Sequence, residues 1–124
     1  MAKKRLLYTT MRLIWAGKPC SESFNPFKSA VGLGIRSDKP IPLKKVLQLA
    51  NVDDLLWVLC KAMPVEDRDT AKWVRKCLEA WACGGWDMTG VVGTKVWSPK
   101  IEKAYIARYT AFARETLKGV RSNA

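Results

Sequence analysis

The chain of 124 residues contains no histidine. Histidine is the usual general base near neutral pH and the commonest protein ligand of metal ions. Its absence removes every Ser-His and Cys-His arrangement that activates a nucleophile. We therefore expect a non-enzymatic protein, with no catalytic residue, no metal and no cofactor.

Long apolar runs are also missing, and no stretch approaches the ~18 apolar residues of a membrane span. The basic N-terminus has no small-residue cleavage site, which predicts a cytoplasmic protein, in the host cell if a phage encodes it. It should have no membrane partner. Cys20, Cys60, Cys77 and Cys83 lack the close paired spacing of a zinc site, and we expect reduced thiols in the core. The length suits one domain, residues 1–124.

Acidic residues are scarce: 11 Asp and Glu oppose 22 Lys and Arg, for a formal net charge of +11. Residues 1–45 hold ten bases and two acids, and residues 95–124 hold seven and two. Residues 46–70 hold two bases and five acids. Two basic chain ends around a mildly acidic middle predict a polarised surface that faces a polyanion. The alternative is a basic composition that serves solubility alone.

Phosphate-binding and catalytic motifs are incomplete. The segments GLGIRSD and GVVGTK each have two glycines but lack the full spacing of a phosphate-binding loop. Asp53 and Asp54 are adjacent carboxylates, but we interpret Asp53 as the cap of a helix. Nucleotide binding and acid catalysis are therefore not predicted.

The pattern predicts a mainly α fold, a single small domain of about five helices. Residues 4–18 have helical spacing of apolar residues but also many β-favouring residues, so both a helix and a strand stay open there. Residues 19–42 should be mostly loop, with one short helical turn around 24–31. Two short helices should meet at Asn51, the second of them apolar nearly all round and central to the core.

A further helix should begin at the acids 66–69 and bury Trp73, Val74, Cys77, Leu78 and Trp81. Residues 86–97 contain two glycines between β-favouring residues and predict a loop or a short β-hairpin. Ser98 and Pro99 should then start a long terminal helix that runs to about Lys118.

The terminal helix is amphipathic in an unusual way. At about 100° per residue, its cations project into an arc of roughly 60°. Apolar residues face away from them: Ile101, Tyr105, Tyr109, Phe112, Ala113 and Leu117. The arc, here called the basic stripe, consists of Lys100, Lys103, Arg114, Lys118 and Arg121.

The basic stripe is a candidate binding surface for phosphates, together with cations from the other chain end. A solvated helix face is the equally weighted alternative. The candidate contacts beyond the stripe are Lys95, Lys3, Lys4, Arg5 and Arg12. Trp57, Trp73 and Trp81 fit the core, whereas Trp86 and Trp97 flank the glycine-rich segment and are candidates for base stacking or for a protein contact.

Residues 16–59 carry a recognisable order of residues, from Cys20, Phe24 and Phe27 to the segment IPLKKVLQLANVDDLLWVLC. This order resembles a segment of uncharacterised phage and bacterial proteins described as putative immunity-type proteins. Its most specific part is Val52, Asp53, Asp54, Leu56, Trp57 and Leu59; Asn51 and Leu55 depart from it. The resemblance implies a helical domain of phage or mobile-element origin, and brings no catalytic residue.

These observations predict a phage-type binding protein that inhibits a host defence or nucleic-acid-handling complex, by analogy with anti-CRISPR proteins. Its partner would be a nucleic acid or a nucleoprotein complex, met through the basic surface. One alternative is a protein–protein inhibitor that binds through residues 86–97. Another is a nucleic-acid-binding regulator.

Overall fold

The computed structural model describes residues 5–82 and 99–123. The elements in chain order are β1 (Tyr8–Thr9), α1 (Met11–Ala16), α2 (Ser21–Val31), β2 (Ile41–Pro42), α3 (Leu43–Leu49), α4 (Val52–Lys61), the 3-10 helix η1 (Val65–Asp67), α5 (Arg68–Ala80) and α6 (Pro99–Lys118). The mainly α class is confirmed, with six α-helices among the described residues. The hairpin expected at 86–97 lies outside them.

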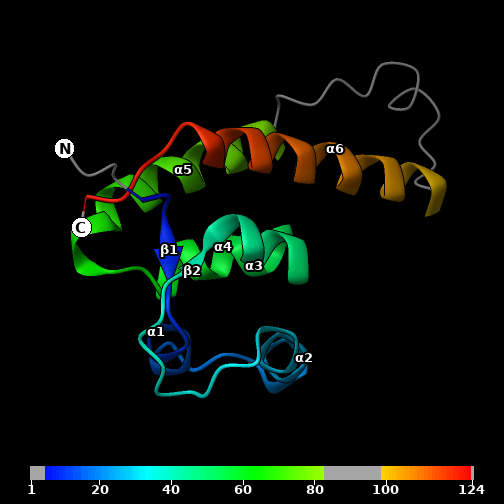
Figure 1. The fold of residues 1–124 in the computed structure, drawn as a ribbon. Helices are drawn as coiled ribbons and strands as arrows, with labels where there is room; N and C mark the ends of the chain where they lie inside the picture. Colours follow the sequence, from blue (N-terminus) through cyan, green and yellow to red (C-terminus); the bar gives the residue numbers. More distant parts are fainter. Residues whose placement is uncertain (1–4, 83–98, 124) are drawn as a thin grey trace.

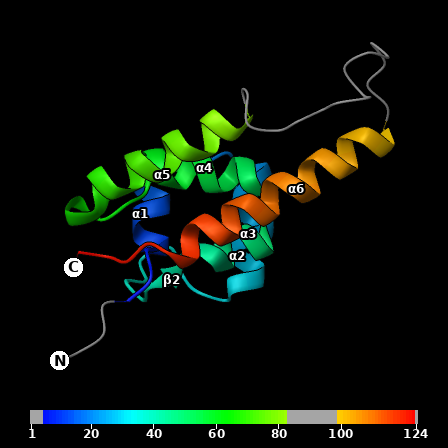
Figure 2. The same ribbon diagram turned by 90° about the horizontal axis from the view of Figure 1, so that it is seen from above.

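The helices form stacked layers. Figure 1 shows α5 and α6 above α3 and α4, with α1 and α2 on the opposite side. Seen from above, α5 and α6 lie side by side over the middle layer (Figure 2). Helix α4 contacts α1, α3, α5 and α6, which confirms its central place.

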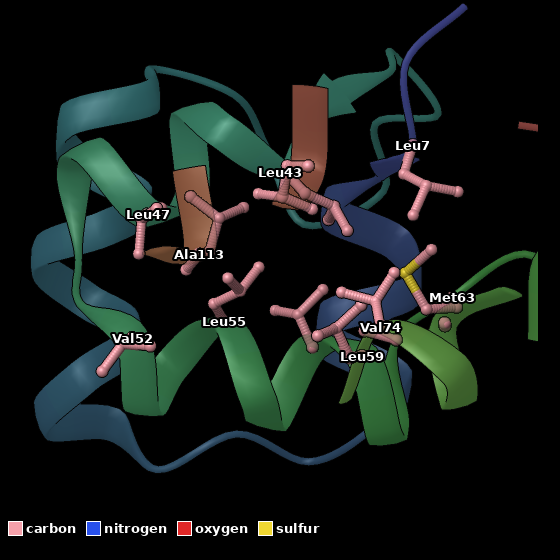
Figure 3. Packing of buried hydrophobic residues seen from close by; sticks show 14 of the residues in the cluster. Leu7, Leu43, Leu47, Val52, Leu55, Leu59, Met63, Val74 and Ala113 are labelled. Carbon is pink, nitrogen blue, oxygen red and sulfur yellow. The ribbon is translucent and has the colours of Figure 1, made fainter. Parts of the chain in front are cut away.

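The core lies where these layers meet α4. Leu55 of α4 is fully buried, as is Leu78 of α5. Leu7 and Leu43 pack into the core beneath α6, and Met63 packs into it just after the end of α4 (Figure 3). Burial of such side chains is the main favourable term in folding.

The N-terminal segment contains both a strand and a helix. Tyr8 and Thr9 pair antiparallel with Pro42 and Ile41. The Thr10 side chain then caps α1 by accepting a hydrogen bond from the Leu13 amide at 3.1 Å. The mixed β and helical signals in this stretch therefore belong to successive residues.

Helix α2 is longer than predicted, since it spans Ser21–Val31 and not only one turn around 24–31. Pro26 lies inside it, where the missing N–H and the ring disfavour a helix. Burial of Phe24 and Phe27 offsets this cost. Gly32 ends the helix with φ of 74°, a left-handed conformation that favours glycine.

The corner between α3 and α4 forms as predicted, but with a different cap. The Asn51 side chain accepts a hydrogen bond from the Asp54 amide at 2.8 Å, so Asn51 caps α4. The prediction that Asp53 is the cap was wrong. Asp53 lies one residue inside the helix, where its charge complements the positive end of the helix dipole.

The predicted buried face of α5 is confirmed for Val74 and Leu78, whereas Cys77 and Trp81 are half-buried and Trp73 is exposed. Ala71, Val74 and Leu78 are buried, whereas Trp73 is 56% exposed. Two rows of apolar residues run along this helix, and the row that contains the small Ala71 faces the core. Trp81 is half-buried and stacks on Tyr109 of α6, with ring centroids 4.9 Å apart.

The described cysteines are free thiols. The prediction that they lie in the core was wrong. Cys20 and Cys60 are exposed, and Cys77 is half-buried. Among residues 5–82 and 99–123, no group of three or more potential ligands could hold a metal ion. Within the same ranges, none of the helices combines the length and the apolar character that crossing a membrane requires.

Candidate nucleic-acid interface

Helix α6 has the two faces that its sequence predicts. Tyr109, Ala113 and Leu117 are buried against the core, and Arg114 and Lys118 are exposed. Arg121 lies three residues beyond the helix, and its Nη1 donates to the carbonyl of Lys118 at 2.8 Å. Cations at a helix C-terminus are favoured because the last carbonyls have no partner within the helix. This bond fixes the Arg121 guanidinium beside the end of α6.

The two described chain ends lie together. Leu6 forms an isolated antiparallel bridge with Arg121, and the Ser122 amide donates to the Arg5 carbonyl at 2.8 Å. Figure 1 shows both ends on the same side of the molecule. The backbones of the N-terminal and C-terminal segments are therefore neighbours in the fold.

A buried carboxylate holds the C-terminal tail in place. Asp67 is fully buried, and it accepts hydrogen bonds at 2.6 Å from both the Ser122 hydroxyl and the Asn123 amide. The Asn123 side chain also donates to the Glu66 carbonyl at 3.3 Å. A buried carboxylate needs such donors, because an unpaired one is costly. We call this set of contacts around Asp67 the C-terminal latch.

A hollow of about 630 Å³ opens between the N-terminal segment, α3 and the end of α6. We call it the terminal hollow. Its apolar lining residues are Leu6, Leu7, Leu43, Leu47 and Leu117. Its polar lining residues are Gln48, Lys44, Arg114, Lys118 and Arg121, so none of the described residues that line it is acidic.

One of the cations that line the terminal hollow has an acidic partner within α6. Lys118 forms an exposed ion pair with Glu115 at 2.9 Å. The hydrogen bond and charge of Lys118 lower the pKa of Glu115, so this carboxylate stays ionised near neutral pH. Exposed ion pairs contribute little to stability and exchange readily with solvent. Lys118 can therefore leave Glu115 for a phosphate at small cost.

The terminal hollow brings together only part of the predicted contact set. Arg114, Lys118 and Arg121 line it, and Lys44 joins them although it was not predicted. Lys103 is exposed on α6, eleven residues before Arg114 and hence roughly 16 Å further along the axis. Lys100 lies in the first turn of α6. Lys3, Lys4, Lys95, Trp86 and Trp97 lie outside the described residues.

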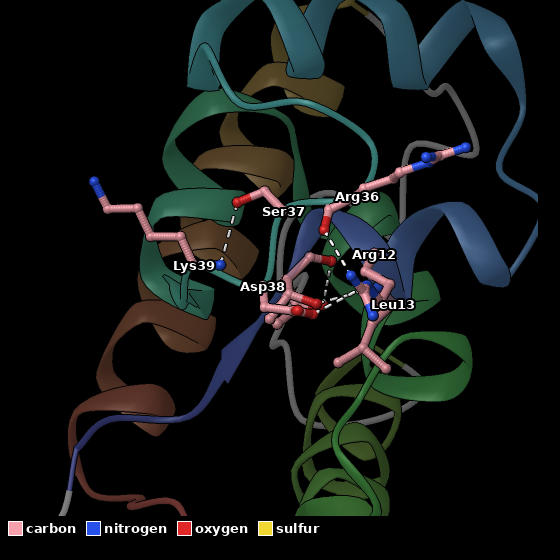
Figure 4. Close-up of polar contacts among 8 residues, drawn as sticks. Arg12, Leu13, Arg36, Ser37, Asp38 and Lys39 are labelled. Carbon is pink, nitrogen blue, oxygen red and sulfur yellow. Dashed lines mark hydrogen bonds and ion pairs between the residues drawn. The ribbon is translucent and has the colours of Figure 1, made fainter.

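Arg5 and Arg12 have other contacts. The Arg5 guanidinium lies over the Tyr8 ring, 5.3 Å from its centroid. Arg12 forms an ion pair with Asp38 at 3.2 Å and donates to the Arg36 carbonyl (Figure 4). Arg12 thus ties α1 to the loop before β2, and it does not line the terminal hollow.

A second hollow, of about 430 Å³, lies where α4 begins, α5 ends and α6 begins. We call it the acidic hollow, because Asp53, Glu79 and Glu102 line it and no described cation does. Nearby, burial and the charge of Asp53 raise the pKa of Asp54. The described linings of the two hollows beside α6 therefore carry charge of opposite sign.

Comparison of the chain with protein-family models, with curated proteins and with solved structures found no match. The resemblance of residues 16–59 to phage and bacterial proteins therefore stays a prediction. The site is assigned on its geometry and charge alone.

Proposed function

We propose that this chain is a non-enzymatic binding protein whose terminal hollow engages nucleic acid, free or within a nucleoprotein complex. The observation that carries the proposal is the convergence of Lys44, Arg114, Lys118 and Arg121 on one concave surface that no described carboxylate lines. These cations come from segments about 70 residues apart, and the fold places them together.

Phosphate recognition suits these side chains. Arginine offers a planar fork of donors to phosphate oxygens, and lysine offers a mobile charge. Concave surfaces of one charge also concentrate the field and speed the capture of an oppositely charged partner. The leucine floor adds apolar surface that can contact sugars or bases.

The chain would then act by occupying a surface and not by chemistry. The lack of histidine supports this, since the usual general base is missing. A small basic protein of this kind would inhibit a host nucleic-acid-handling or defence complex, in the manner of an anti-CRISPR protein, or regulate it. The resemblance to phage and bacterial proteins that the order of residues 16–59 predicts would fit the same role.

Neighbouring lysines on α3 provide a matched test. Lys44 lines the terminal hollow, whereas Lys45 is exposed and does not. Binding of fluorescently labelled duplex and single-stranded oligonucleotides would be measured by anisotropy for Lys44→Glu and Lys45→Glu. We expect about tenfold weaker binding for Lys44→Glu and a clearly smaller loss for Lys45→Glu.

Reversal of two charges extends the test. The combination Arg114→Glu with Lys118→Glu should abolish measurable binding, while circular dichroism shows the helical content of the wild type. Equal losses in the two lysine variants, or full binding by the double variant, would contradict the proposal. In that case Trp86→Ala and Trp97→Ala would test the alternative of a protein contact through residues 86–97.

A further inference from the structure

A second basic groove lies between α1, the end of α4 and the first half of α5. Its volume is about 430 Å³. We call it the α5 groove; it is lined by Leu13, Ala16, Leu59, Cys60, Lys61, Met63, Arg68, Lys72 and Arg75. It shares no lining residue with the terminal hollow. The two surfaces can therefore be altered separately.

Four cations converge on the α5 groove. Arg68, Lys72 and Arg75 follow one another at spacings of four and three residues, so they project from the same face of α5. Lys61 joins them from the end of α4. None of the described residues that line the groove is acidic.

Arg75 has hydrogen-bonding capacity that the protein does not use. Its Nη1 donates to the Cys60 thiol at 3.4 Å, and sulfur is a weak acceptor. Its Nε is buried, and among the described residues it has no hydrogen-bond acceptor. The Glu79 carboxylate oxygen is 3.8 Å from Nε, an ion-pair distance that is too long for a hydrogen bond.

The Arg75 side chain is 31% exposed, so the outer donors of its guanidinium can reach a charged oxygen in the groove, which is a much stronger acceptor than the thiol. We propose that the α5 groove binds a phosphate group, with Arg75 as the fixed contact and Lys61, Arg68 and Lys72 as mobile ones. The group is a backbone phosphodiester of nucleic acid or a free phosphate. Of these two sources of the phosphate group, only the nucleic-acid backbone rests on the proposed function.

Cys60 provides a direct reporter, because its exposed thiol lies in the α5 groove. Cys20 is an exposed thiol that lines neither basic surface, so it serves as an internal control. Alkylation by the neutral reagent iodoacetamide would be followed at both sites by peptide mass spectrometry. The probes are inorganic pyrophosphate and a dT12 oligonucleotide, at constant ionic strength set with sodium chloride.

We expect saturable protection of Cys60, several-fold in rate, with the rate at Cys20 unchanged. Protection by pyrophosphate assigns the groove to free phosphate, and protection by dT12 alone assigns it to nucleic-acid backbone. Protection by neither probe, or equal protection of Cys60 and Cys20, overturns the inference.

Charge reversal at an exposed lysine tests the groove without disturbing the fold. Lys72→Glu should raise the half-saturating probe concentration about tenfold or more, because it reverses one of the four charges. Lys39→Glu is the control, since Lys39 is exposed in the loop before β2 and points to solvent (Figure 4). Identical protection curves for the two variants would contradict the inference.

The double variant Arg114→Glu with Lys118→Glu separates this inference from the proposed function. The probe that protects Cys60 in the wild type should still protect it in that variant, even though nucleic-acid binding by the terminal hollow is lost. Conversely, unprotected Cys60 in a wild-type protein that binds oligonucleotides would overturn the α5 groove alone.

Discussion

The terminal hollow and the acidic hollow lie toward opposite ends of α6 and differ chiefly in charge. Both have an apolar floor, but cations line the first and Asp53, Glu79 and Glu102 line the second. Of these two concave surfaces, only the terminal hollow has the charge that attracts a polyanion. Nucleic acid would be attracted to the terminal hollow and repelled from the acidic hollow.

The largest effect should come from breaking the C-terminal latch. Asp67→Ala removes the carboxylate that accepts from the Ser122 hydroxyl and the Asn123 amide, and should lower the free energy of unfolding by about 1–3 kcal/mol. It should also weaken nucleic-acid binding, because the tail carries Arg121 into the terminal hollow. Chemical denaturation and anisotropy measure the two effects.

The matched control is Asp69→Ala. Asp69 is an exposed acid in the first turn of α5, and its loss removes only a favourable dipole interaction of about 0.3–1 kcal/mol. Nucleic-acid binding by Asp69→Ala should equal that of the wild type. An Asp67→Ala protein as stable as Asp69→Ala would show that the latch does not hold the basic end together.

A smaller effect should follow from removing the acid beside the terminal hollow. Glu115→Gln releases Lys118 from its ion pair and deletes a charge that opposes phosphate binding. Affinity for duplex DNA should rise a few-fold, and the salt dependence should steepen by up to about 1 in slope. Stability should hardly change, since the pair is exposed. Weaker binding by Glu115→Gln would contradict the assignment of Lys118 as a phosphate contact.

The smallest effect concerns the acidic end. Because the pKa of Asp54 is raised in the folded state, its ionised form disfavours folding above that pKa. This cost to the stability of the folded protein decreases as the pH falls below the pKa of Asp54 in the folded state. It is absent below the pKa of Asp54 in the unfolded chain. Asp54→Asn should therefore be slightly more stable than the wild type at pH 7, within about 0.5 kcal/mol.

The measurement for Asp54 is urea denaturation of the two proteins between pH 3 and pH 7. The difference in unfolding free energy should shrink as the pH falls. A difference that grows toward low pH would mean that the pKa of Asp54 is lowered in the folded state.

The sequence predicted the bounds of α6 and the exposure of Lys103, Arg114 and Lys118, because one helical period of 3.6 residues runs along the whole segment. It did not predict Lys44 in the terminal hollow, since α3 and α6 meet only through the tertiary fold. The prediction that Trp73 is buried was wrong, because two rows of apolar residues run along α5. Periodicity alone does not show which row faces the core. The cap at Asn51 was missed because Asp53 satisfies the same local preference.

The α5 groove was missed for a different reason. Lys61 and Arg68 lie in the region with an excess of acids, and the helical pattern of α5 places Lys72 and Arg75 on a polar face that solvation alone explains. A net charge counted over consecutive residues hides cations that α4 and α5 bring together.

Likewise, nothing local to Asp67 indicates that its carboxylate binds the chain end more than fifty residues later.

The central claim is that the four cations of the terminal hollow neutralise phosphates together. The most direct test is a salt titration of duplex DNA binding for the wild type and for Arg114→Glu with Lys118→Glu. For the wild type, four phosphate contacts predict a slope of log affinity against log salt of roughly −3 to −4. The double variant should show almost no affinity, whereas a wild-type slope near zero, or the same slope in both proteins, would contradict the claim.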